Sequence, residues 1–265
     1  MKAIVISGAS GGLGAALARH YAAPGVALGL IGRNPDRVEA VAAACRQAGA
    51  VVEAAAIDVR ETARLEAFIR AFNARHPVTT VIANAGIEAG LAPGRKPEPA
   101  ESATAQLRVN LEGAIATVAP VIEPMRGRGG GRIVLIASLA ALMPLADQPA
   151  YSASKAGLVA WGEALSAWLR RDGIKVTIVC PGFVATGMRD HYRGPRPFEW
   201  SAERAAGHIA RGAAAGRAWI AFPWPLVWLI RLGRLAPRPL RAAFIDRFLR
   251  FEIDAPAGYG DSLKE

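Results

Sequence analysis

Residues 2–14 of the chain are Lys-Ala-Ile-Val-Ile-Ser-Gly-Ala-Ser-Gly-Gly-Leu-Gly, and the helical pattern Ala-Ala-Leu-Ala-Arg-His-Tyr-Ala-Ala follows directly. The apolar, partly β-branched start predicts a buried strand, and the glycines predict a tight turn into a helix. The free amides at the start of such a helix attract phosphate. Because four glycines in seven residues (8–14) exceed what a plain strand-to-helix turn needs, the stretch favours dinucleotide binding, with the plain turn as the alternative.

A second expected strand, residues 26–31, ends at Gly32-Arg33. In a doubly wound sheet the end of this strand meets the adenosine ribose, where an acidic residue binds the 2′-hydroxyl of NAD and an arginine accommodates the 2′-phosphate of NADP. Arg33 in this place favours NADPH/NADP+ over NADH/NAD+ as the cofactor. A solvated loop arginine is the alternative interpretation.

Strand and helix patterns alternate along the rest of the chain with short connections, which predicts a parallel sheet covered by helices on both faces. The fold class is therefore α/β, a three-layer doubly wound parallel sheet of about seven strands. No repeat or linker divides residues 1–222, which are expected to form a single domain, with 223–265 as its helical C-terminal extension. The expected strands are 2–7, 26–31, 51–57, 80–83, 132–137, 175–179 and 218–222, and the later helices are 36–47, 61–75, 100–125, 150–172 and 202–215.

Tyr151 and Lys155 lie in a helical pattern and face the same side, one turn apart. A free phenol titrates near 10, too high for efficient proton exchange at neutral pH. A lysine about 4 Å away would stabilise the phenolate by roughly 4 kcal/mol at an effective dielectric of 20, and would lower the pKa of the phenol by up to about 3 units. The spacing therefore predicts an acid/base, although it also occurs in ordinary surface pairs.

The net charge of +10 and the pI near 10.4 favour acidic partners such as phosphorylated cofactors, acyl carriers or anionic lipid. Nucleic acid is not an expected partner, because no basic helix with interleaved aromatics and no known nucleic-acid module occurs. The four histidines and the two cysteines, Cys45 and Cys180, lack ligand or disulfide spacing, so no metal is expected. The first residues lack a signal-peptide apolar region, which predicts a cytoplasmic protein.

Taken in order, the motifs resemble those of the short-chain dehydrogenase/reductase family, a Rossmann-fold group of NAD(P)-dependent oxidoreductases. The resemblance is strongest over residues 2–186. Ser7 stands where the family often has threonine, and its hydroxyl can substitute. The motifs that carry the resemblance are Ser7-Gly8-x-x-x-Gly12-x-Gly14, Asp58-Val59, Asn84-Ala85-Gly86, Asn110, Ser138, Tyr151 with Lys155, and Pro181-Gly182 with Thr186.

The resemblance implies a Rossmann-type catalytic domain with four catalytic residues. Tyr151 is expected to be the general acid/base, and Lys155 to lower its pKa and bind the nicotinamide ribose. Ser138 is expected to polarise the substrate carbonyl. Asn110 is expected to support a water relay from Lys155 to solvent.

The same resemblance implies where a nicotinamide cofactor binds. Its phosphates and ribose are expected at the glycine turn, its adenine at residues 58–59, its central part at 84–86 and its nicotinamide amide at 181–186. The expected cofactor-binding residues are Gly8, Ser10, Gly11, Gly12, Leu13, Gly14, Arg33, Asp58, Val59, Asn84, Ala85, Gly86, Tyr151, Lys155, Pro181, Gly182, Val184 and Thr186.

Mostly apolar residues flank the expected site, which favours a small apolar carbonyl or alcohol over a sugar phosphate. The expected substrate contacts are Ser138, Met143, Tyr151 and Phe183, with core packing as the alternative for Met143 and Phe183. The expected function is an NADP(H)-preferring oxidoreductase that interconverts a carbonyl and a secondary alcohol. The alternatives are a 3-oxoacyl reductase for acyl-carrier or lipid substrates, and a non-catalytic NAD(P)-binding sensor or assembly protein.

The C-terminal extension mixes tryptophan, aliphatic residues and arginine over residues 224–251. Its apolar run is shorter than the ~20 residues of a membrane span, and Pro223 and Pro225 interrupt it. Two interpretations remain open: interfacial helices in peripheral contact with a membrane surface, and a helical hairpin packed on the substrate cleft or on a partner subunit. The family resemblance also implies a homodimer or homotetramer formed through the helices that carry Asn110 and Tyr151.

Overall fold

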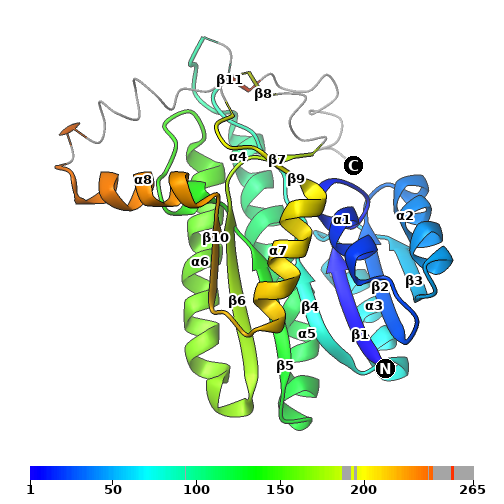
Figure 1. Cartoon of the computed structure of the whole chain (residues 1–265). Helices are drawn as coiled ribbons and strands as arrows, with labels where there is room; N and C mark the ends of the chain where they lie inside the picture. The colour runs from blue at the N-terminus through cyan, green and yellow to red at the C-terminus, as the bar shows by residue number, and fades with distance from the viewer. Residues whose placement is uncertain (93, 187–191, 194–195, 238, 241–251, 254–265) are drawn as a thin grey trace.

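A computed structural model describes residues 1–92, 94–186, 192–193, 196–237, 239–240 and 252–253 (Figure 1). Seven strands of this part of the chain form one parallel sheet in the order β10-β6-β5-β4-β1-β2-β3. The strands are β1 (Lys2–Ser7), β2 (Val26–Gly32), β3 (Val51–Ala56), β4 (Val78–Ala83), β5 (Gly131–Ile136), β6 (Ile174–Pro181) and β10 (Trp219–Phe222).

Helices cover both faces of the sheet and make it the middle of three layers (Figure 1). One face carries α1 (Gly12–Tyr21), α2 (Pro35–Gln47) and α7 (Ala202–Ala214), and the other carries α3 (Thr62–Arg75), α5 (Gly113–Gly127) and α6 (Pro149–Leu169). Each face has its own cluster of buried apolar side chains. The predicted three-layer doubly wound fold is confirmed.

The strand order reverses between β1 and β4, which lie side by side at the centre of the sheet. The chain builds one half from β1 outward to β3, and it then returns to start the other half at β4. In such sheets ligands bind outside the carboxyl ends of the strands, at this switch point. The glycine turn after β1 and the Asn84-Ala85-Gly86 motif after β4 both lie there.

The predicted helix 100–125 is divided into three parts: α4 (Ala100–Leu107), a π-helical turn at Arg108–Glu112, and α5. The π-helical turn carries Asn110, in keeping with the frequent occurrence of such turns at functional sites. Gly113 follows, where a Cβ would lie only 2.5 Å from the side chain of Val59. The helix is therefore packed closely on the segment that follows β3.

Short elements complete the carboxyl side of the sheet: β7 (Val184–Ala185) pairs with β9 (Trp200–Ser201), and β8 (Tyr192–Arg193) pairs with β11 (Glu252–Ile253). The first part of the extension forms α8 (Trp224–Leu235), as the helical interpretation expected. The later part of the expected helical extension, residues 241–251, lies outside the described residues. Among the described helices, none has both the length and the apolar character that a membrane crossing requires.

Candidate active site

The glycine turn leads from β1 into α1 through backbone that only glycine adopts readily. Gly8 and Gly12 have φ values of 68° and 51°. At Gly14, a Cβ would lie 2.1 Å from the carbonyl oxygen of Gly8. Gly11, which precedes α1, places no side-chain cap on its first amides. These open amides fit a pyrophosphate, as the sequence predicted for this turn.

Asn84 ties the end of β4 to the end of β1. Its side-chain amide donates to the carbonyl oxygens of Ser7 at 3.2 Å and Gly8 at 3.1 Å. The Ser7 hydroxyl accepts from the amides of Asn84 at 3.3 Å and Ala85 at 3.4 Å. The two predicted cofactor motifs therefore form one hydrogen-bonded unit, and the Ser7 hydroxyl has a structural role in it.

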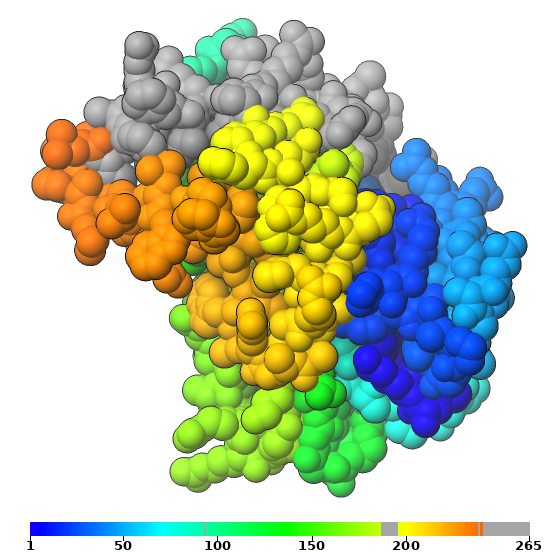
Figure 2. Space-filling model, in the orientation of Figure 1, coloured from blue at the N-terminus to red at the C-terminus, as the bar shows by residue number. Residues whose placement is uncertain are grey.

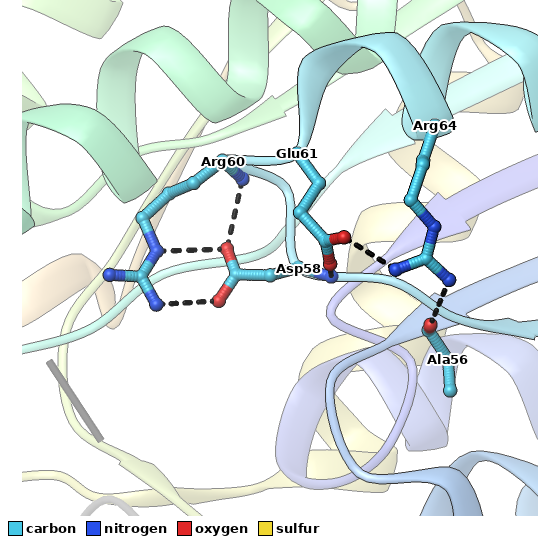
Figure 3. Close-up of polar contacts among 5 residues, drawn as sticks. All are labelled: Ala56, Asp58, Arg60, Glu61 and Arg64. Atoms are coloured by element: carbon cyan, nitrogen blue, oxygen red, sulfur yellow. Dashed lines mark hydrogen bonds and ion pairs between the residues drawn. The ribbon is translucent and has the colours of Figure 1, made fainter. Parts of the chain in front are cut away.

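At the other end of the expected cofactor site, Arg33 follows β2 and is exposed. The Arg60 guanidinium donates two hydrogen bonds to the Asp58 carboxylate, from Nε to Oδ1 at 3.0 Å and from Nη2 to Oδ2 at 2.9 Å (Figure 3). Burial raises the pKa of Asp58, but the hydrogen bonds from Arg60 and the charge of Arg33 outweigh it, and the pKa is lowered. Of the predicted adenine-binding pair, Val59 is buried in the core, whereas Asp58 is only partly buried.

Asn110 is fully buried, and its amide holds the loop that follows β4. Its Oδ1 accepts from the Ile87 amide at 2.8 Å, and its Nδ2 donates to the Ile87 carbonyl at 2.9 Å and to the Ser154 hydroxyl at 3.0 Å. Both hydrogens of Nδ2 are therefore used. A water relay from Lys155 remains a prediction. Its waters would have to bind groups other than the Nδ2 hydrogens of Asn110.

Tyr151, Lys155 and Ser138 come together at the carboxyl ends of β5 and β6. The Ser138 hydroxyl lies near enough to the Tyr151 phenol to lower its pKa by hydrogen bonding. Lys155 is buried, its Nζ lies 5.8 Å from the centre of the Tyr151 ring, and it donates to the Ile136 carbonyl at 2.9 Å. A Cβ at Gly86 would lie 3.3 Å from the same Nζ. The structure thus brings the predicted acid/base pair, the serine and the Asn84-Ala85-Gly86 loop into one site.

Burial and charge act on the pKa values of both members of the Tyr151–Lys155 pair. Burial, and next the charge of Glu88, raise the pKa of the phenol, while the Ser138 hydrogen bond opposes them. Burial lowers the pKa of Lys155 to about 8. The lowering of the Tyr151 pKa by Lys155 stays a prediction, because helical spacing predicts how close two residues lie, whereas the desolvation of both groups depends on the tertiary packing.

The segment after β6 closes the site on its other side. A Cβ at Gly182 would lie 2.9 Å from the Pro223 ring, and one at Gly12 would lie 3.0 Å from the Thr186 side chain. Thr186 therefore lies close to the glycine turn, and its contact with the nicotinamide amide stays a prediction. Cys180, at the end of β6, is buried, and burial raises the pKa of its thiol to about 12.

Two of the predicted substrate contacts lie in or beside the core. Met143 is 3% exposed and belongs to the buried cluster that α8 also joins. Phe183 is partly buried, and it packs against that cluster. Met143 thus lies where the packing alternative placed it, and its contact with substrate stays a prediction.

Glu88 is the ionisable residue of this site that the sequence analysis did not select. Gln148, the residue before α6, donates to its carboxylate. The charge of Glu88 acts on both Tyr151 and Lys155. Its position two residues after the Asn84-Ala85-Gly86 motif is the feature of the sequence that could have identified Glu88 as a residue of the site.

Known proteins match the chain over most of its length. The family model for short chain dehydrogenases matches residues 2–196. An uncharacterized oxidoreductase of Myxococcus xanthus is 34% identical over 240 residues, which is 90% of this chain and 94% of that protein. Ketoacyl reductase HetN of a Nostoc species is 35% identical over 193 residues, 71% of this chain and 65% of that protein.

A solved structure shares the fold as well. The short chain dehydrogenase/reductase of Burkholderia phymatum, in complex with NAD, is 26% identical and superimposes with a TM-score of 0.80 over 88% of this chain and 93% of that one. Sequence and fold point the same way as the motifs quoted above. The chain therefore belongs to the short-chain dehydrogenase/reductase family, and it is an oxidoreductase that acts on CH–OH groups with a nicotinamide cofactor.

Proposed function

We propose that this protein is an NADP(H)-preferring reductase that interconverts an apolar carbonyl compound and a secondary alcohol. The observation that carries the proposal is the convergence of the Ser138 hydroxyl on the Tyr151 phenol, with the Lys155 ammonium buried beside them. The cofactor supplies the hydride when it is bound. The protein's own part is to orient the carbonyl and to deliver a proton.

In the proposed reduction, the Ser138 hydroxyl donates a hydrogen bond to the substrate oxygen and polarises the carbonyl. Tyr151 then gives its phenolic proton to that oxygen as negative charge develops there. A phenol with a raised pKa is in the protonated form at neutral pH, as a donor must be. Lys155, whose pKa burial lowers to about 8, is poised to return a proton to Tyr151.

The proposed cofactor site runs along the carboxyl ends of the strands. The glycine turn (Gly8 to Gly14) would hold the phosphates, and Arg33 and Asp58 would lie at the adenosine. The loop Asn84-Ala85-Gly86 and Lys155 would lie at the ribose nearer the reacting centre, and the segment from Pro181 to Thr186 at the nicotinamide amide. The open amides of α1 and the close approach of Thr186 to Gly12 support this path.

The proposed substrate is apolar, with a 3-oxoacyl compound as the second candidate. The relative named ketoacyl reductase HetN favours that candidate. The absorbance of NADPH at 340 nm tests both, with simple aliphatic and aromatic ketones, 3-oxoacyl thioesters and ketose sugars compared at equal concentration. Turnover of a ketose sugar faster than of every apolar ketone and thioester would contradict the proposed substrate class.

Arg33 is proposed to bind the 2′-phosphate of NADPH. Arg33→Ala is expected to raise the Kd for NADPH by roughly 10- to 100-fold, because a charge-assisted contact to phosphate contributes about 1.5–3 kcal/mol. The Kd for NADH is expected to change less than about threefold. Titration of the protein against each cofactor, followed by nucleotide fluorescence, measures both constants.

Arg70→Ala is the matched control, since it also removes one positive charge. Arg70 is exposed on α3, where it pairs with Glu66 at 2.7 Å, and its loss is expected to leave both constants unchanged. Equal losses of NADPH and NADH affinity in Arg33→Ala would remove the 2′-phosphate assignment. The NAD complex of the Burkholderia phymatum protein makes NAD(H) the competing outcome.

The proposed assembly is a homodimer or homotetramer in the cytoplasm, formed through the helices that carry Asn110 and Tyr151. Large apolar side chains on these helices support the proposal: Leu107 at the end of α4 is 39% exposed and Trp168 near the end of α6 is 55% exposed. Contiguous apolar patches mark interaction sites, whereas single exposed apolar residues are normal on a monomer, so burial of these two side chains in one contact is part of the proposal.

We also propose that α8 makes the peripheral membrane contact considered for residues 224–251. One side of α8 packs into the core through Leu226, Val227 and Ile230. The other side exposes Trp224, Trp228, Leu232 and Leu235, together with arginines and no acidic residue. In Figures 1 and 2 this helix, drawn in orange, projects from one side of the molecule. Tryptophan and arginine at such a surface suit anionic headgroups.

Sedimentation with phosphatidylglycerol vesicles at low salt tests this contact. The wild-type protein is expected to bind, and the double variant Trp224→Ser, Trp228→Ser to bind at least about fivefold more weakly, because two interfacial anchors are lost. Trp219→Ser, which removes an exposed tryptophan from β10, is expected to bind like the wild type. Absence of wild-type binding at low salt, where electrostatic attraction is greatest, would contradict the proposal.

A further inference from the structure

Glu88 and its neighbours are held in place by three buried amide side chains, which come from α4, from the π-helical turn and from the residue before α6. Asn110 binds the backbone of Ile87 at both its amide and its carbonyl. Gln106, one turn earlier, accepts from the Ala89 amide at 3.0 Å. Gln148 donates to the Glu88 carboxylate itself. The residues on either side of Glu88 are thus clamped, and its side chain has a dedicated donor.

The three amides are among the most completely buried polar groups of the described chain. Asn110 and Gln106 are 0% exposed and Gln148 is 1% exposed. Burying a polar side chain costs free energy unless it is hydrogen-bonded. Each of these three amides forms at least one hydrogen bond to the loop at residues 87–89. A loop that only connected β4 to α4 would not need one residue to be held from both sides.

The carboxylate so placed acts electrostatically on the two groups proposed to move the proton. It raises the pKa of Tyr151, and it raises that of Lys155 against the larger, opposite effect of burial. The pKa of Glu88 itself is raised overall, because burial outweighs the Gln148 hydrogen bond and the charges of Lys155 and Arg196, which favour the ionised form. A negative charge here stabilises the state in which both the phenol and the amine carry their protons.

Other charged or titratable groups near the loop that carries Glu88 come from three segments. Arg196, on the segment before β9, also pairs with Glu199 at 3.9 Å. Asp147, next to Gln148, pairs with Arg95 at 3.3 Å. Cys180, at the end of β6, has a pKa that burial raises to about 12, so its thiol stays neutral through the range of interest.

We propose that Glu88 is a positioning residue whose carboxylate keeps both Tyr151 and Lys155 protonated through neutral pH. Carbonyl reduction requires this protonated state. The inference rests on the proposed role of Tyr151 as proton donor. An enzyme does not change the reaction equilibrium, so the Glu88 carboxylate cannot favour one direction of the reaction. It changes the pH range over which Tyr151 and Lys155 are protonated. Both directions of the reaction shift together when that range shifts.

The first test needs no substrate, because it follows the Lys155 amine. The chain has five lysines, so the ¹³Cε signals of protein labelled with [¹³C]lysine can be resolved, and the Lys155→Met variant identifies the signal of interest. In the wild type this signal is expected to titrate near pH 8. In Glu88→Gln, which keeps the size of the side chain and an acceptor for Gln148, the midpoint is expected to fall by about one pH unit.

Two further variants separate charge from loop geometry. Glu88→Asp keeps the charge and is expected to titrate close to the wild type. Glu98→Gln removes another carboxylate of the same loop, which accepts from Gln106 at 2.6 Å and from the Ala150 amide at 3.1 Å, and its midpoint is expected to stay at the wild-type value. An unchanged midpoint in Glu88→Gln would overturn the proposal, as would an equal shift in Glu88→Asp or in Glu98→Gln.

The second test is the pH dependence of kcat/KM for the best ketone from the NADPH assay and for its alcohol. Both profiles are expected to shift to lower pH in Glu88→Gln by about the amount seen in the lysine titration, while the neutral plateau of reduction stays within a few-fold of the wild type. Active Tyr151→Phe would refute the proposed function. Inactive Tyr151→Phe with superimposable profiles for wild type and Glu88→Gln would refute only the role of Glu88.

Discussion

Tyr151→Phe is expected to lower turnover by roughly 10²- to 10⁴-fold, the usual contribution of general acid/base catalysis, while the Kd for NADPH changes little. The variant loses a single oxygen, the one that Ser138 contacts. The aromatic ring keeps its packing, and Lys155 keeps its bond to the Ile136 carbonyl. NADPH oxidation at 340 nm measures turnover, and nucleotide fluorescence measures binding.

Tyr21→Phe provides the control for loss of a phenolic hydroxyl away from the site. Tyr21 ends α1, beside Lys2 and His20, and its variant is expected to turn over like the wild type. Turnover in Tyr151→Phe close to the wild-type rate would show that another group supplies the proton. A wild-type protein that binds NADPH but turns over no ketone or thioester would favour the non-catalytic sensor.

Gly14→Ala is expected to lower the free energy of unfolding by roughly 3 kcal/mol or more, because the new methyl group has no room. Its Cβ would lie 2.1 Å from the Gly8 carbonyl oxygen and 2.5 Å from Nδ2 of Asn84. These atoms belong to backbone and to a fixed hydrogen-bonded amide, so they cannot move aside as a flexible side chain would. The Kd for NADPH is expected to rise at least about tenfold, since the same turn positions the amides at the start of α1.

Gly11→Ala tests whether this effect is specific to the crowded position. Gly11 has an extended backbone with a φ of 179°, and no atom lies within 4 Å of a Cβ placed there. Its variant is expected to unfold at the wild-type denaturant midpoint. Chemical denaturation followed by tryptophan fluorescence compares the two variants, and a Gly14→Ala protein as stable as Gly11→Ala would contradict the packing argument.

The local pattern of the sequence was sufficient for much of this protein. The alternation of buried strands and amphipathic helices predicts the three layers, since each residue type follows the period of its element. Short motifs predict the site, because Gly8, Asn84, Ser138 and Gly182 follow four different strands, and parallel strands bring their carboxyl ends to one edge. The family follows from the order of these motifs.

Other features depend on contacts between residues that are distant in the sequence. The π-helical turn at Arg108–Glu112 and the clamp that Asn110 and Gln106 place around Glu88 join segments some twenty residues apart, which no local periodicity reports. Which side of α8 packs and which is exposed depends likewise on where the core lies.

The protonation of the active site shows this division most clearly. The sequence by itself determined that Tyr151 and Lys155 lie one turn apart on a helix, because that distance is a property of the helix. Only the tertiary structure decided that burial and the Glu88 carboxylate raise the pKa of the phenol, and that burial lowers the pKa of the amine. Desolvation and the distance to a charge from another loop are properties of the packed molecule.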